Sequence, residues 1–113
     1  MIGFTYIDEN SMGGKHPTPL DYEDVTVLPN GTVSILTPAK VAACVCALVK
    51  WEVSIFKVRW DGKGLPVAGS SGMTRNSGDE YFCSKEEAAQ LVCIIDTTLA
   101  GLTTGFMRVT YYG

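Results

Sequence analysis

The stretch Thr37–Trp60, TPAKVAACVCALVKWEVSIFKVRW, contains two different structural patterns. Thr37 and Pro38 are typical of a helix start, because a threonine side chain can cap free amides and proline needs no amide donor in the first turn. The small and apolar residues that follow predict a helix over about 38–50. Residues 51–60 are β-branched and aromatic with partial alternation, which predicts a strand. A helix followed at once by a strand indicates a mixed fold.

A second helix is predicted over about 85–100. Ser84 and Glu87 have the spacing of a capping box, in which each side chain bonds the other residue's backbone amide. Apolar residues then recur at helical spacing as far as Leu99, which indicates one apolar stripe. Gly101 is a natural helix stop because glycine adopts the left-handed conformation that ends many helices.

The remaining segments predict strands. Residues 25–28 and 32–36 flank an Asn-Gly pair at 30–31, and this pair favours a tight β-hairpin. Residues 2–7 alternate sufficiently to predict a first strand, and residues 106–112 predict a last one. A strand at the extreme end of the chain must pair inside the sheet or with another subunit.

The length of 113 residues predicts one domain over 1–113. Prolines and glycines predict an irregular arm at 8–21 and a Gly/Ser-rich loop at 63–79, with a short strand around 65–68. The fold class that follows is α+β. We expect an antiparallel-dominated sheet of about five strands with the two helices (38–50 and 85–100) packed on one face.

The composition favours self-association. Charged residues make up 19% of the chain, below the roughly 25% that is usual for soluble domains, while 46% of residues are hydrophobic. Few charges must therefore cover a large surface, which favours a homo-oligomer, a dimer or larger, whose subunits cover apolar area for one another. The alternative is that threonine, serine and glycine cover this surface.

Charge is unevenly distributed along the chain. Residues 1–24 carry five acidic groups against one lysine, a net charge of −4, and residues 40–75 carry six basic against two acidic groups, a net charge of +4. The overall charge of −3 argues against a generic polyanion binder. The candidate contacts with an anionic partner, either RNA or an acidic protein, are Lys50, Lys57, Arg59 and Lys63. The alternative is that these charges are solvated or form ion pairs within the fold.

Catalysis and metal binding receive little support from the sequence. His16 is the one histidine, and the cysteines at 44, 46, 83 and 93 lack metal-ligand spacing. Cys83 is the best-placed thiol, because it precedes a predicted helix whose dipole would lower its pKa. No phosphate-binding or dinucleotide motif is present. We therefore expect no enzyme, no cofactor, no metal and no small-molecule substrate, with a minor enzyme that uses Cys83 as an alternative.

No secretory signal and no membrane segment is visible. The uncharged run of nine residues at 41–49 falls short of the roughly 20 that a spanning helix needs. The expected location is therefore the cytoplasm, or the virion if the protein is viral.

The composition is similar to that of small viral or phage coat and virion-accessory subunits. The shared features are few lysines and glutamates, many threonines, valines and glycines, a long amino-terminal arm and a terminal strand. Some coat proteins of single-stranded RNA phages likewise combine an antiparallel sheet with helices that pack across a dimer. This resemblance implies a non-enzymatic structural subunit that self-associates through its sheet edge and helix stripe. The alternative is a small protein-binding or inhibitor module that acts through the 8–21 arm or the 63–79 loop.

Overall fold

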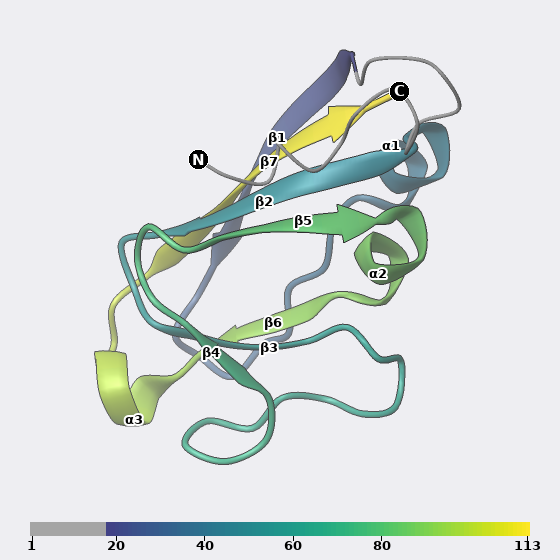
Figure 1. Ribbon diagram of the computed structural model, residues 1–113. Coiled ribbons are helices and arrows are strands. Elements are labelled where there is room, and N and C mark those ends of the chain that lie inside the picture. Colours follow the sequence, from purple (N-terminus) through teal and green to yellow (C-terminus); the bar gives the residue numbers. More distant parts are fainter. Residues whose placement is uncertain (1–17) are drawn as a thin grey trace.

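The computed structural model describes residues 18–113 and shows an α+β fold with two antiparallel sheets (Figure 1). The four-stranded sheet has the order β1-β7-β2-β5 and comprises β1 Pro19–Val27, β7 Gly105–Tyr112, β2 Cys46–Glu52 and β5 Glu80–Ser84. The three-stranded sheet has the order β4-β3-β6 and comprises β4 Met73–Arg75, β3 Phe56–Arg59 and β6 Val92–Ile95. The three short helices are α1 Pro38–Ala43, α2 Lys85–Gln90 and α3 Thr97–Ala100. The prediction of one sheet of about five strands with two helices is thus matched only roughly.

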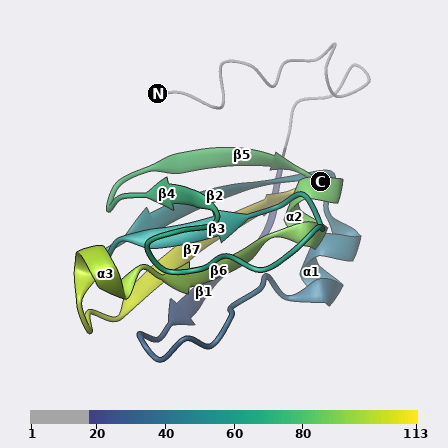
Figure 2. The same cartoon turned by 90° about the horizontal axis from the view of Figure 1, so that it is seen from below.

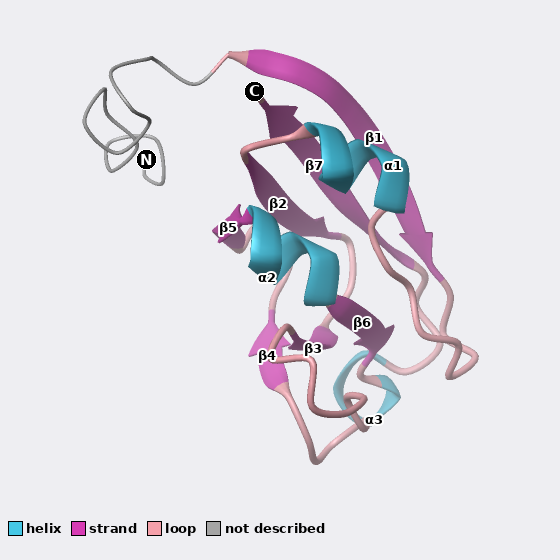
Figure 3. Cartoon of the chain, turned by 90° about the vertical axis from the view of Figure 1, so that its right-hand side faces the viewer, coloured by secondary structure: helices cyan, strands magenta, loops and turns pink. Residues whose placement is uncertain are grey.

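The core lies between the two sheets, and helices α1 and α2 close one end of it. Figure 3 shows these two helices side by side on one face of the four-stranded sheet, and Figure 2 shows the strands of the smaller sheet on that same side. Alternate residues of the central strands point inward because side chains alternate across a strand. The fully buried ones are Ala47, Val49, Trp51, Met107, Val109 and Tyr111. Phe56, Val58, Cys93 and Ile95 meet them from the smaller sheet.

The predicted helix over 38–50 is wrong beyond its first turns. Only Pro38–Ala43 is helical, and the chain becomes strand β2 at Cys46. Strand β2 pairs with β5 on one side over Cys46–Lys50 and with β7 on the other over its whole length, so the ladder satisfies most of its backbone groups. A short apolar run fits a buried strand as well as a buried helix, since it has no polar stripe that would distinguish the two.

The predicted helix over 85–100 is also wrong in its length. Its start is confirmed, because Ser84 Oγ accepts from the Glu87 amide at 3.1 Å and Glu87 Oε1 accepts from the Ser84 amide at 2.9 Å. The helix ends at Gln90, and the β-branched run that follows forms strand β6. The predicted stop at Gly101 is confirmed as the end of a separate helix, α3, with a φ of 62°.

The predicted hairpin over 25–36 is wrong in its pairing. Strand β1 pairs with β7, and of residues 32–36 only Ser34 makes a bridge, to Cys93 of β6. The turn chemistry is nevertheless present, because Gly31 has a φ of 81° and the Asn30 side chain accepts from the Thr32 amide at 3.0 Å. The Asn-Gly pair therefore turns the chain without returning it to the same sheet.

The predicted strand over 51–60 is split into two strands in different sheets. Strand β2 ends at Glu52 and β3 begins at Phe56. Between them Val53 has a φ of 81°, a conformation that is rare for a β-branched residue. This sharp turn carries the chain from one sheet to the other.

The terminal strand is confirmed and lies inside the four-stranded sheet, between β1 and β2. The predicted arm at 8–21 is wrong in its last residues, because β1 begins at Pro19. Residues 8–17 of the arm and the predicted strand at 2–7 lie outside the described residues. The loop at 63–79 contains strand β4 rather than the strand expected at 65–68.

Candidate protein-interaction site

The long loop that joins β3 to β5, residues 60–79, presents apolar side chains to solvent. Leu65 is 60% exposed, and Val67 and Met73 are each 52% exposed. Pro66 is buried between the first two, so the loop is seated on the fold while its large apolar side chains point outward. Single exposed apolar residues are common on protein surfaces, but three on one ordered loop form a candidate contact.

The first anchor of this loop is the carboxylate of Asp96, which is fully buried at the start of α3. Asp96 Oδ1 accepts from the Gly69 amide at 3.0 Å and from the Thr98 amide at 3.1 Å. Burial alone would raise the pKa of Asp96, but these amides and the Thr98 hydroxyl outweigh it and hold the pKa below its usual value. The charged carboxylate therefore holds the middle of the loop by a charge-assisted bond.

A lysine completes this anchor. Asp96 Oδ2 accepts no hydrogen bond, but Lys57 Nζ lies 4.0 Å from it. The same amine donates to Thr74 Oγ1 at 2.6 Å, which ties β4 to β3. The Lys57 side chain is only 12% exposed, so its charge compensates a buried carboxylate and does not face a partner.

The second anchor is an arginine box, in which Arg75 of β4 sits among the rings of Trp51, Trp60 and Tyr81. Arg75 Cζ lies 5.3 Å from the Trp51 and Trp60 ring centroids and 5.5 Å from the Tyr81 centroid. Trp60 and Tyr81 stack on each other with their centroids 4.7 Å apart. Each distance from Arg75 Cζ to a ring centroid is within the range in which an aromatic ring attracts a cation.

The four predicted anion contacts do not form one patch. Lys50 lies on β2 in the other sheet and pairs with Glu52 at 3.6 Å. Lys57 forms an ion pair with the buried carboxylate of Asp96, and Arg59 pairs with Asp61 at 2.8 Å. Lys63 is exposed, and its amide donates to the Asp61 carboxylate that Arg59 also contacts. The structure therefore brings Arg59 and Lys63 together and places the other two elsewhere.

Sequence reasoning missed Asp96 and Arg75, the two residues that hold the loop. Asp96 follows a β-branched run and precedes two threonines, so its position as a helix cap could have been inferred from sequence. Arg75 lies in a Gly/Ser-rich segment, and no local pattern connects it with aromatic residues elsewhere in the chain.

An apolar groove lies between helices α1 and α2. Its volume is about 400 Å³, and its walls are Ile35, Leu36, Pro38, Val41, Ala42 and Ala89. Lys85 and Glu86 flank it with opposite charges. We call this cavity the helix groove. It is open to apolar side chains because most of its lining carries no hydrogen-bonding group.

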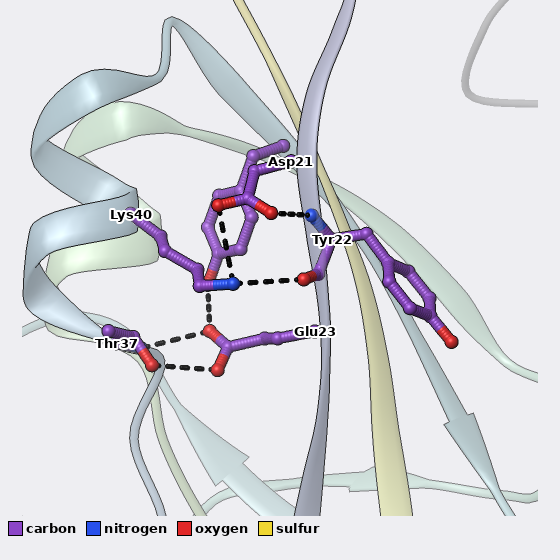
Figure 4. A network of polar contacts seen from close by, with 6 residues as sticks. Asp21, Tyr22, Glu23, Thr37 and Lys40 are labelled. Atoms are coloured by element: carbon purple, nitrogen blue, oxygen red, sulfur yellow. Dashed lines mark hydrogen bonds and ion pairs between the residues drawn. The ribbon is translucent and has the colours of Figure 1, made fainter.

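Side chains protect the outer edge of β1, the first strand of the four-stranded sheet (Figure 4). The Tyr22 amide donates to Asp21 Oδ1 at 2.7 Å, and the Tyr22 carbonyl accepts from Lys40 Nζ at 3.0 Å. Lys40 also pairs with Asp21 at 3.3 Å. The Tyr22 amide and carbonyl are thus already satisfied and cannot bond an added strand, a local protection against edge pairing.

Helix α1 is held against the same strand by Glu23, as Figure 4 shows. Glu23 Oε2 accepts from the Thr37 hydroxyl at 2.7 Å and Oε1 accepts from the Thr37 amide at 3.1 Å and from the Tyr111 hydroxyl. Burial raises the pKa of Glu23, but these hydrogen bonds lower it below its usual value overall. The amino terminus of α1, one wall of the helix groove, is therefore fixed in place.

All four cysteines are buried and unpaired. Burial, together with the charge of Glu87, raises the pKa of the Cys83 thiol to about 12. The pKa of Cys83 is therefore raised and not lowered as predicted, mainly because the buried thiol is desolvated. A thiol with such a pKa remains protonated near neutral pH, so the alternative of a Cys83 enzyme gains no support.

Comparison with known proteins found no matching family model, no matching curated protein and no matching solved structure. Among residues 18–113, no three or more His, Cys, Asp or Glu side chains are grouped to hold a metal ion. None of the helices in this part of the chain is long and apolar enough to cross a membrane. The surfaces described above are therefore the basis for a functional proposal.

Proposed function

We propose that the chain is a non-enzymatic structural subunit that self-associates, of the general kind that builds viral or phage coats. The observation that carries this proposal is the outward position of Leu65, Val67 and Met73 on a loop held from inside by two anchors. An ordered loop loses little conformational entropy when it binds, so its apolar side chains can contribute most of their burial energy to a contact.

The recipient that we propose is the helix groove of a second copy. The groove is apolar, as the exposed side chains of the loop are. A loop on one copy and a groove on the next make a head-to-tail contact, which generates rings or filaments.

This proposal replaces pairing through the edge of β1. That edge is protected where Asp21 and Lys40 satisfy the Tyr22 backbone, so an added strand would first have to displace both side chains. Helices α1 and α2 belong to the proposal because they form the groove, but the apolar stripe predicted over 85–100 does not line it.

The experiment is a measurement of mass by light scattering after size-exclusion chromatography. The wild type is expected to have a mass several times that of one chain. Leu65→Glu is expected to be a folded monomer, because a charge at the loop tip must be desolvated in the groove. Leu102→Glu is the matched control: Leu102 is 82% exposed and lies outside the loop, so this variant should assemble as the wild type does.

A monomeric wild type would overturn self-association. In that case the same loop would favour the second candidate, a module that binds a different protein. Assembly of Leu65→Glu to the wild-type mass would instead show that the chain associates through another surface.

A further inference from the structure

The arginine box is already a binding site for a cation, which the chain fills with its own side chain. Trp51 contributes a ring from β2, Trp60 follows β3 and Tyr81 comes from β5, so both sheets contribute to the box. Tyr81 is fixed because its hydroxyl donates to Glu87 Oε2 at 2.7 Å. Three rings around one positive centre form an arrangement that binds alkylammonium and guanidinium groups in other settings.

Arg75 is held in the box mainly by the rings. No carboxylate among residues 18–113 lies within ion-pair distance of it, and its Nε is buried without a hydrogen-bond partner. Among residues 18–113, its one side-chain hydrogen bond runs from Nη2 to the weak acceptor Met73 Sδ at 3.2 Å. A guanidinium with so few hydrogen bonds is less firmly held than one in a bidentate ion pair, so another cation can compete with it.

Strand β4 can leave without disrupting either central pairing. It has three residues and pairs only with β3, at the edge of the smaller sheet. Gly72, with a φ of 118°, and Gly78, with a φ of 97°, flank it and provide backbone freedom on both sides. The box and its usual occupant are thus on separate elements, and β4 can move away once its pairing with β3 and the Lys57–Thr74 hydrogen bond break.

We infer that the box is a recognition site for an alkylammonium or guanidinium cation, such as a methylated lysine or an arginine of a partner, and that Arg75 is its built-in competitor. Ligand binding then requires β4 to move out. The apparent affinity is reduced by the small fraction of molecules in which the box is open. This inference does not rest on loop-in-groove assembly, but opening the box also moves Met73 of β4 and releases one of the two anchors of the loop.

The experiment uses choline as the probe and its neutral isostere 3,3-dimethylbutan-1-ol as the control ligand. Choline should quench the tryptophan fluorescence of Arg75→Ala saturably, and the isostere should not, because only the charge differs. The apparent affinity of the wild type for choline should be at least about ten-fold lower, as expected for a closed majority state. Trp60→Ala in the Arg75→Ala background should lose the response.

The wild type gives a second, independent measurement by hydrogen exchange. Choline should accelerate exchange of the β4 amides and leave β7 unchanged, and the isostere should accelerate neither. The inference is overturned if choline and the isostere act alike, or if choline leaves β4 exchange unaltered. This arm decides the matter even if Arg75→Ala does not fold, and Arg75→Gln provides a variant that keeps the length of the side chain.

Discussion

Val53 has a backbone conformation that its side chain disfavours. Its φ is 81°, and it is the one non-glycine residue with positive φ among residues 18–113. Such a conformation costs about 1–3 kcal/mol, and it persists where the surrounding structure imposes it. Here the surrounding structure is the crossing from β2 to β3, where the Val53 amide donates to Ser77 Oγ at 3.0 Å.

We therefore predict that Val53→Gly stabilises the protein by about 1 kcal/mol, since glycine adopts positive φ without strain. The side chain is 55% exposed, so little burial is lost. Urea unfolding measures the change. Val45→Gly is the matched control, because Val45 is 50% exposed and lies outside the positive-φ region. A loss of stability at both positions would contradict the presence of strain at Val53.

Asp96 makes stability depend on pH. Because its pKa in the folded state lies below the usual value, the folded protein binds fewer protons than the unfolded chain when the pH is near 4. Its contribution is therefore fully present above the unfolded pKa, about 4, and is lost as the pH falls through the lower folded value. Glu23 acts in the same direction.

For Asp96→Asn we predict a free energy of unfolding about 2 kcal/mol lower at pH 7, because a charge-assisted bond to the loop is lost. The dependence of stability on pH between about 3 and 5 should also be weaker than in the wild type. Urea unfolding at several pH values measures both quantities. An unchanged pH dependence would show that Asp96 is not held as a carboxylate by Gly69 and Thr98.

Local signals in the sequence predicted where elements start and end better than whether a segment is a helix or a strand. The capping box at Ser84, the stop at Gly101 and the terminal strand are all confirmed. The helices were predicted too long because most residues of Cys46–Glu52 and Val92–Ile95 are buried, and their position in a sheet depends on partners far away in the chain. The long-range contacts of Asp96 and Arg75 could not be predicted for the same reason.

The protection of β1 by Lys40 leads to a prediction about this edge strand. Lys40→Ala leaves the Tyr22 carbonyl without its partner and removes the charge that opposes strand addition. In the Leu65→Glu background, where the proposed contact is absent, we expect this change to cause aggregation that increases with concentration. Light scattering over time measures it.

Lys50→Ala in the same background is the control for this prediction. Lys50 is also a lysine of the four-stranded sheet, but it lies on the inner strand β2. Equal aggregation of the two variants, or none in either, would show that Lys40 does not protect the edge.

The whole molecule separates its proposed contact surfaces. The loop 60–79 belongs to the smaller sheet and its anchors, whereas α1 and α2 form the groove. Two different surfaces on one chain suit a head-to-tail assembly, in which each copy uses its loop on one neighbour and its groove on the other. This geometry is the central claim of the proposed function.

The most direct test is the mass of a mixture of two variants, measured by light scattering. Leu65→Glu keeps an intact groove, and Ala89→Arg keeps an intact loop while placing a charge in the groove. Each variant alone should be a monomer, and an equimolar mixture should form a dimer with one chain of each kind, because only one loop-in-groove contact can form. A mixture that remains monomeric, or an Ala89→Arg variant that assembles like the wild type, would contradict the claim.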